Sequence, residues 1–415
     1  MQKNKDGEAN KYSIFAPFKQ KITIMKALKL FSTLLLAGML VSISSCKDGT
    51  KASDPLADSG RTERTENLLA NMDSLSRIGY MFGHHDDTVY GIGWVGDSAA
   101  SDVKSVCNDY PAVIGFDIAN IELGDSVNID GVSFDKIREE VINQYNRGGV
   151  VTISWHANNP STTANAWVKD ANNPTSEEKQ TVASILEGGK NHDKFVGWLK
   201  NVSTFLNSLE TPYGVRVPVI FRPWHENTGS WFWWGKAECT PEQFKALWVM
   251  TIEQLKNNDV VNALYAYSPG GEETPSGGHY MERYPGDEYV DVLGLDIYCM
   301  AESSEDTLFI AAFANSLDKN LDVVCNLGAE HNKVVALTET GFEGIKTTNW
   351  WTATLAPVLD KHNIAYAYVW RNAHDKVNHF YAPYPGQKSA SDFVSFYNLP
   401  KTLFAHDLNG MYLKN

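Results

Sequence analysis

Residues 217–235 read VPVIFRPWHENTGSWFWWG, and the order of residue types in this stretch decides the predicted fold. The apolar run at 217–221 is typical of a strand that is buried on both faces. Charged and aromatic side chains follow it at once. In a barrel of parallel strands, functional side chains collect at the carboxyl ends of the strands. The stretch therefore predicts a barrel strand that ends in a functional site, with these candidates: Arg222, Trp224, His225, Glu226, Trp231, Trp233 and Trp234.

Seven other short apolar runs alternate with helical patterns along the chain. The eight predicted strands cover residues 78–83, 112–118, 150–155, 217–221, 263–267, 292–297, 334–337 and 365–370. Ser133 is a candidate cap for a helix through Tyr145, and Thr240 begins a capping box with proline at the first helical position. This alternation predicts a single-domain (β/α)8 TIM barrel. A doubly wound open sheet is the alternative, but no glycine-rich phosphate loop follows the first strand.

The segment before residue 62 is expected to lie outside the barrel. Residues 25–45 have the short basic start and apolar middle of a signal peptide, and residues 1–24 would lie upstream of the true start. Ile43-Ser44-Ser45-Cys46 resembles a bacterial lipobox, which predicts lipidation at Cys46. We expect a tether over 46–61, a catalytic domain over 62–415, and export to a bacterial membrane, on its periplasmic or cell-surface face. A plain secretory signal is the alternative.

Composition limits the class of partner. The 415 residues include 36 Lys and Arg against 50 Asp and Glu, and the net charge of −14 argues against a nucleic-acid partner. The 12 Trp and 18 Tyr offer flat rings on which sugars stack. We expect a neutral carbohydrate ligand, a lipid anchor as the only membrane contact, and a monomer. Four further cysteines could form up to two disulfides or remain thiols: Cys107, Cys239, Cys299 and Cys325.

Polar or aromatic residues stand at nearly every predicted strand end, which purely structural strands would not show so consistently. Adjacent His84 and His85 point to opposite sides of an extended chain, and no metal-binding spacing appears, so the sequence predicts neither a metal nor a cofactor. The residues at the other strand ends include Asp86, Asp117, Asn120, Glu122, His156, Ser268, Asp296, Tyr298, Glu339, Trp370, Arg371 and Asn372.

Two glutamates stand out because they follow the fourth and seventh predicted strands, whose ends face each other across a barrel mouth. Retaining glycoside hydrolysis needs a carboxylic acid and a carboxylate nucleophile about 5–5.5 Å apart. Nearby Trp224 and Trp231 would keep a proton on Glu226, which fits a general acid. Tyr298 could hold Glu339 ionised as the nucleophile. A structural salt bridge between Glu226 and Arg222 is the competing interpretation.

These residues also carry a family resemblance. The segments FRPWHENTGSWFWWG, DIY and ALTETG resemble the β-mannanases of glycoside hydrolase family 26, over roughly residues 62–412. The resemblance implies retaining hydrolysis of β-1,4-mannan, endo- or exo-acting, with Glu226 as acid/base and Glu339 as nucleophile. It implies substrate contacts from His156, Arg222, His225, Trp231, Asp296, Tyr298, Trp370 and Arg371. Strand-end position adds His84, Asp86, Trp224, Trp234 and Asn372 as weaker candidates.

Two departures and several alternatives remain open at the level of sequence. His225 stands where the wider clan has Asn, as in family 26, and Asn227-Thr228 stands where many relatives have Met-Asn. The same chemistry on β-1,3-1,4-glucan or β-1,3-xylan is one alternative, and non-catalytic capture of polysaccharide by a lipoprotein is another. A metal-dependent barrel hydrolase would need ligands that the sequence does not show. The inserts 161–190 and 270–287 are expected to narrow the cleft.

Overall fold

The structure is a computed structural model that describes residues 55–96, 100–162, 165–169 and 175–414. The predicted signal peptide, Cys46 and most of the tether lie outside the described residues. The barrel strands are β1 (Tyr80–His85), β4 (Val113–Asp117), β5 (Val150–Trp155), β6 (Val219–Pro223), β7 (Ala263–Tyr267), β8 (Val292–Cys299), β9 (Val334–Phe342) and β10 (Tyr366–Val369). The short strands are β2 (Tyr90–Gly91), β3 (Trp94–Val95) and β11 (Thr402–Leu403).

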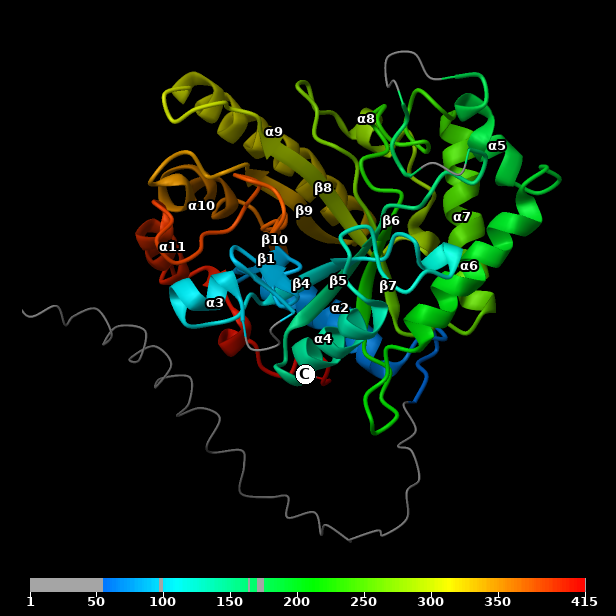
Figure 1. Cartoon of the computed structure of the whole chain (residues 1–415), viewed down its shortest axis with the longest axis horizontal. Helices are drawn as coiled ribbons and strands as arrows, with labels where there is room; N and C mark the ends of the chain where they lie inside the picture. Colours follow the sequence, from blue (N-terminus) through cyan, green and yellow to red (C-terminus); the bar gives the residue numbers. More distant parts are fainter. Residues whose placement is uncertain (1–54, 97–99, 163–164, 170–174, 415) are drawn as a thin grey trace, which may run out of the picture. The chain divides into compact units, whose positions relative to one another are not determined.

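The eight barrel strands are parallel and pair in chain order, and β10 pairs with β1 to close the barrel. This closure confirms the predicted (β/α)8 fold and removes the open-sheet alternative. Helices flank the strands, as Figure 1 shows with α9 to α11 on one side and α5 to α7 on the other. The helices are α2 (Glu63–Ser76), α3 (Asp102–Cys107), α4 (Phe134–Asn146), α5 (Thr181–Ile185), α6 (His192–Asn207), α7 (Pro241–Asn257), α8 (Gly277–Met281), α9 (Thr307–His331), α10 (Ala356–Leu359) and α11 (Ala390–Tyr397).

Local sequence signals fix two of these helices as predicted. The Ser133 hydroxyl accepts the Lys136 N–H at the start of α4. Thr240 and Gln243 form both bonds of the capping box at α7. The buried face of α7 includes Phe244, Leu247, Trp248 and Leu255, the same apolar residues that the helical period places on one side.

Strand β9 is the main departure from the predicted elements, because it continues past residue 337 to Phe342. Its register against β8 shifts between two pairs: Leu295 pairs with Leu337, whereas Asp296 pairs with Glu339. The extra residue is Thr338, and a matching shift occurs against β10. Such a bulge re-aims the next side chain. Glu339 therefore lies within the strand and not after it.

The four described cysteines are free thiols, which selects one of the two states that the sequence left open. No helix among the described residues is both long and apolar enough to cross a bilayer.

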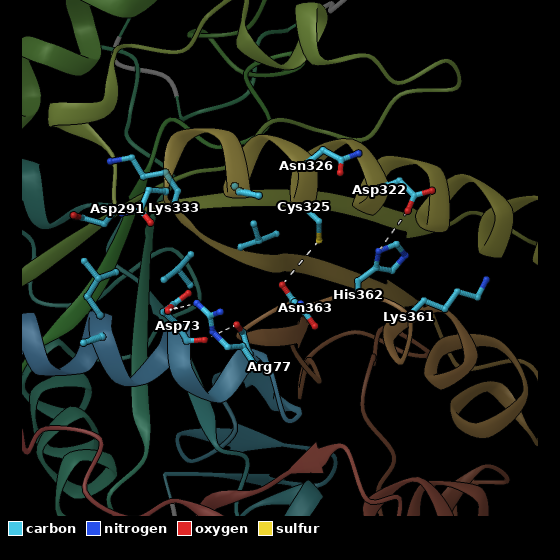
Figure 2. Close-up of a pocket in the computed structure, with 18 of the residues that line it drawn as sticks. Asp73, Arg77, Asp291, Asp322, Cys325, Asn326, Lys333, Lys361, His362 and Asn363 are labelled. Carbon is cyan, nitrogen blue, oxygen red and sulfur yellow. Dashed lines mark hydrogen bonds and ion pairs between the residues drawn. The ribbon is translucent and has the colours of Figure 1, made fainter. Parts of the chain in front are cut away.

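A cavity of about 770 Å³ lies between α2 and α9, at the ends where β8, β9 and β10 begin (Figure 2). Its charged side chains already have partners: Arg77 pairs with Asp73, and Lys361 with Asp318. This is the opposite end of the strands from the predicted site, the end that in barrels serves stability.

Candidate active site

A tight turn after β6 places Glu226. Trp224 and Glu226 both have left-handed backbone conformations, with φ of 53°. The Glu226 N–H donates to the Ser268 carbonyl beyond β7, at 2.7 Å. Left-handed backbone at non-glycine residues is costly and often found at functional sites. The side chain of Glu226 is also held, because the indole N–H of Trp231 donates to Glu226 Oε2 at 2.7 Å. The backbone and side-chain bonds together hold the carboxyl group in one orientation.

Arg222 of β6 joins the acids of β8 and β9. Its Nη1 donates to Asp296 Oδ2 at 2.8 Å and to Ser268 Oγ at 3.1 Å, and its Nη2 donates to Glu339 Oε1. The Tyr298 hydroxyl donates to Glu339 Oε2 at 2.6 Å. Both oxygens of Glu339 therefore accept hydrogen bonds, as expected for a held carboxylate. The competing salt bridge of Glu226 to Arg222 does not form, because the guanidinium pairs with Asp296 and Glu339.

The two glutamates occupy contrasting environments. Withdrawal from water, followed by the negative charges of Glu339 and Asp296, raises the pKa of Glu226 well above its ordinary value. Glu339 instead has the buried Arg222 guanidinium against it. A protonated acid beside a cation-paired carboxylate is the division of roles that retaining glycoside cleavage requires.

His156, which follows β5, and His225, which follows β6, form a pair of contacting side chains. Nε2 of His156 and Nε2 of His225 are 3.2 Å apart, and His156 Nδ1 lies 2.7 Å from Asp117 Oδ2. Trp167 stacks on His156, with ring centroids 5.1 Å apart and planes 14° apart. Its indole is 42% exposed, as is that of Trp231. Sequence reasoning missed Trp167, because it stands in an insert without a strand or helix period to mark it.

The insert after β5 reaches the site directly. Trp167 forms an antiparallel bridge with Phe232, and the Val168 N–H donates to the Trp231 carbonyl at 2.8 Å. The described part of the insert is therefore attached to the loop that carries Glu226.

The ends of β1 and β10 form a third group. His85 stacks on Trp370 with centroids 4.0 Å apart and contacts the Tyr368 hydroxyl at 2.5 Å. Arg371 pairs with Asp130 at 3.0 Å and donates to the Tyr90 hydroxyl at 3.1 Å. Trp370 is half-buried and Arg371 is buried.

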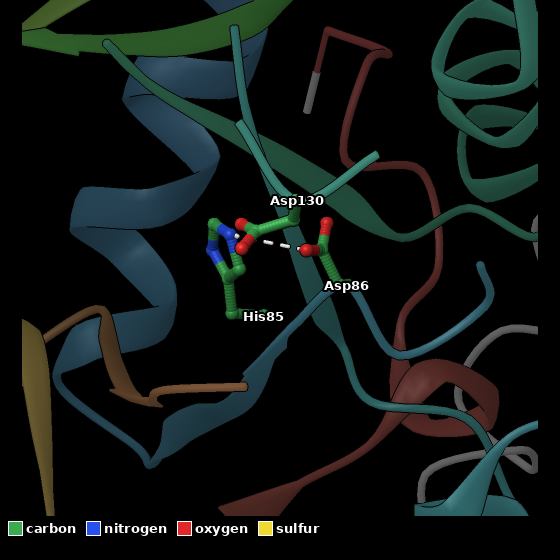
Figure 3. Close-up of side chains that lie close together, drawn as sticks. All are labelled: His85, Asp86 and Asp130. Carbon is green, nitrogen blue, oxygen red and sulfur yellow. Dashed lines mark ion pairs between the residues drawn. The ribbon is translucent and has the colours of Figure 1, made fainter. Parts of the chain in front are cut away.

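The donor atoms of His85, Asp86 and Asp130 lie within 4.8 Å of one another, close enough to be ligands of one cation (Figure 3). The cluster already contains a cation, because the Arg371 guanidinium contacts Asp130. A divalent ion there would lie beside that fixed positive charge. The prediction that the chain needs no metal stays a prediction.

Four weaker candidates have structural roles instead of open faces. Trp224 and Trp234 expose no surface, and their indole N–H groups donate to Thr251 Oγ1 and to the His225 carbonyl. The expectation that these two rings contact substrate is wrong, since they pack behind the site. His84 is buried with Nδ1 against Asp87 at 2.6 Å. Asp86, also buried, accepts the Tyr90 hydroxyl.

Asn372 is the clearest correction. It is fully buried, and its amide nitrogen donates to Asp102 at 2.8 Å and to the Ala382 carbonyl at 3.0 Å. Its amide oxygen accepts the N–H groups of Tyr381 and Ala382, both at 2.9 Å. With its polar atoms used inside the protein, Asn372 ties the loops after β1 and β10 together.

Comparisons with known proteins agree with this geometry. The profile of glycosyl hydrolase family 26 matches residues 57–329. A mannan endo-1,4-beta-mannosidase of Bifidobacterium adolescentis is 29% identical, over 94% of this chain and 39% of the relative. The mannan endo-1,4-beta-mannosidase A and B of Caldalkalibacillus mannanilyticus is 27% identical, over 68% of this chain and 52% of the relative. The chain thus spans about two fifths to half the length of these curated relatives.

Solved structures cover the chain more evenly. A GH26 beta-mannanase from Bacteroides ovatus has 50% identity and a TM-score of 0.79, covering 85% of this chain and 98% of that one. The GH26C protein of a Muricauda species has 31% identity and a TM-score of 0.76, covering 85% of this chain and 94% of that one.

Proposed function

Because the chain belongs to glycosyl hydrolase family 26, we propose that it hydrolyses β-1,4-mannosidic linkages of mannan, galactomannan or glucomannan with retention of configuration. The observation that carries the proposal is the arrangement around Arg222. The guanidinium pairs with Glu339, while Glu226 stands apart with a raised pKa. The choice of mannan rests on the relatives, which are named mannan endo-1,4-beta-mannosidases.

The reaction proceeds in two displacements. Glu339, oriented by Arg222 and Tyr298, attacks the anomeric carbon while Glu226 protonates the leaving oxygen. Glu226, now ionised, then takes a proton from a water molecule whose oxygen attacks the anomeric carbon. The bond between that carbon and Glu339 breaks, which returns Glu339 to its carboxylate and Glu226 to its acid form. Trp231 holds the carboxyl group of Glu226 through both steps, and its exposed ring offers a stacking surface for the leaving sugar.

Turnover of mannan by two variants tests the assignment. Glu226→Ala and Glu339→Ala should each lose about 10²–10⁴-fold or more in kcat, because each removes a group that acts at the reacting atoms. Glu242→Ala, in the exposed first turn of α7, is the matched control and should stay near the wild-type rate. Near-normal turnover by either active-site variant would remove the hydrolase assignment and favour non-catalytic capture of polysaccharide.

Substrate class needs its own assay. Parallel digestion of mannan, β-1,3-1,4-glucan and β-1,3-xylan should give the highest kcat/KM on mannan. Higher kcat/KM on another glycan would keep the chemistry and change the substrate.

The mode of cleavage depends on the loops at the barrel mouth. The bridge between Trp167 and Phe232 supports a cleft narrowed by the insert after β5. Short oligosaccharides should therefore dominate the first minutes of digestion of mannan and galactomannan, as measured by chromatography. A broad ladder of products from the start would contradict a narrowed cleft.

We also propose a lipid anchor at Cys46, based on the lipobox-like residues before it. Expression with labelled fatty acid should label the wild type and leave Cys46→Ala unlabelled and free of the membrane fraction. The catalytic domain is proposed to be a monomer, which light scattering after gel filtration would test.

A further inference from the structure

The hydrolase assignment does not say which ring nitrogens of His156 and His225 carry hydrogens. An Nε2–Nε2 contact of 3.2 Å between His156 and His225 is a hydrogen bond only if it holds exactly one proton. Either histidine could carry that proton. The choice decides which ring offers a donor, and which a lone pair, to a sugar hydroxyl placed against them.

Asp117, the last residue of β4, faces the other side of His156. It is fully buried and accepts from the Ala119 N–H at 2.8 Å, the Ser154 hydroxyl at 2.7 Å and the His156 N–H at 3.1 Å, besides His156 Nδ1 at 2.7 Å. A carboxyl group surrounded by this many donors is held ionised. Its pKa is accordingly lowered, although burial opposes this. His156 Nδ1 must therefore carry a proton.

One further contact and the nearby negative charges favour a second proton on His156. The indole of Trp167 lies parallel to the imidazole, with centroids 5.1 Å apart, and aromatic faces attract cations. Burial disfavours the charge, but the negative charges of Asp117 and Glu339 outweigh it and raise the pKa of His156. The charged and titratable groups around His156 are Asp117 on β4, Arg222 and His225 at β6, Glu339 on β9, His85 on β1, and Asp130 in the loop after β4.

His225 has the opposite surroundings. It is buried among cationic neighbours, and burial followed by the charges of Arg222 and His156 lowers its pKa well below the ordinary value. A neutral His225 that accepts a hydrogen bond at Nε2 carries its own hydrogen on Nδ1.

We propose that Asp117 is a positioning residue for the proposed hydrolysis: through His156 it sets the protons of the histidine pair. His156 then presents a charged N–H at Nε2, and His225 presents a lone pair at Nε2. In the free enzyme this N–H is donated to that lone pair. A sugar hydroxyl that replaces the direct bond accepts from His156 and donates to His225. The inference rests on the proposed function for the identity of the ligand, whereas the proton placement rests on the contacts of the two rings and on the pKa directions that their neighbours impose.

Nuclear magnetic resonance of the wild-type protein labelled with ¹⁵N-histidine tests the placement without any activity. Near pH 7, both ring nitrogens of His156 should carry protons, while His225 should be protonated at Nδ1 only. In Asp117→Asn, His156 should become neutral. A neutral His156 in the wild type, or a proton on Nε2 of His225, would overturn the proposal.

Kinetics on a manno-oligosaccharide provide the functional readout. Asp117→Asn should lose about 10²–10³-fold in kcat/KM at pH 7, the usual effect of losing a preorganised charged donor. The deficit relative to wild type should shrink as the pH falls, because acid restores the proton to His156. Ser154→Ala removes one donor to the same carboxylate, keeps its charge, and should cost less than about threefold.

The outcomes separate the two proposals. A deficit in Asp117→Asn that is the same at every pH would mean a structural role and overturn the inference. If the wild type fails to cleave mannan but its histidines show the expected protons, the proposed function fails and the proton placement stands.

Discussion

Replacing Trp231 by Phe removes one hydrogen bond from Glu226 and leaves an aromatic ring in its place. The indole N–H donates to Glu226 Oε2 at 2.7 Å and lowers the pKa of Glu226, against the larger raising effects of burial and of Glu339. Without this donor the pKa of Glu226 should rise further. Glu226 must be protonated to act as the acid, so the alkaline limb of kcat/KM should move to higher pH.

The size of the shift follows from the bond. A hydrogen bond to a charged group contributes roughly 1.5–3 kcal/mol. The ring of Trp231 is 42% exposed, so water can replace part of the lost bond. A remaining difference of about 1 kcal/mol corresponds to a shift of about 0.7 pH units, since one unit is about 1.4 kcal/mol.

The assay is kcat/KM on an unactivated manno-oligosaccharide, measured across the alkaline limb for wild type and Trp231→Phe. Trp231→Ala is the informative comparison, because it also admits water to Glu226. Water lowers the pKa of Glu226, so the alkaline limb of the Ala variant should lie at lower pH than that of the Phe variant. A limb that moves to lower pH in a folded Phe variant would refute the assigned contact.

Three other changes have defined outcomes. Arg222→Met leaves two buried carboxylates without their cation and should cost about 3–5 kcal/mol of unfolding free energy in urea titration, with loss of activity; unchanged stability would contradict the buried pair. Asn372→Ala leaves several buried groups unpaired and should cost about 3 kcal/mol in the same assay, whereas a cost under about 0.5 kcal/mol would argue against its role in joining the loops. A reducing agent should leave the melting temperature unchanged, because the described cysteines are free; a drop of several degrees would reveal a disulfide.

The sequence predicted the barrel and its two glutamates because both depend on patterns that are local in the chain. Apolar runs alternate with capped helices, and polar residues mark the strand ends. Glu226 follows β6 as expected. The approach of Arg222 to Glu339 could not be predicted, because the bulge at Thr338 that places Glu339 depends on pairing with β8 and β10.

Burial was harder to predict than position. Trp224, Trp231 and Trp234 stand in one motif, yet Trp231 is exposed while the other two are fully buried. Sequence spacing does not distinguish them, because it shows neither the left-handed backbone at Trp224 and Glu226 nor which rings the folded loop buries. Trp167 comes from a different segment, and its contact with His156 arises only from tertiary packing.

The central claim is that Glu339 is the nucleophile and Glu226 is the general acid and base. Azide rescue tests it most directly, using a β-mannobioside with an activated phenol leaving group and NMR of the product. In Glu339→Gly, azide should enter in place of the nucleophile and give an α-glycosyl azide; in Glu226→Ala, azide should replace water in the second step and give the β-glycosyl azide. Exchanged configurations, or the same anomer from both variants, would contradict the assignment.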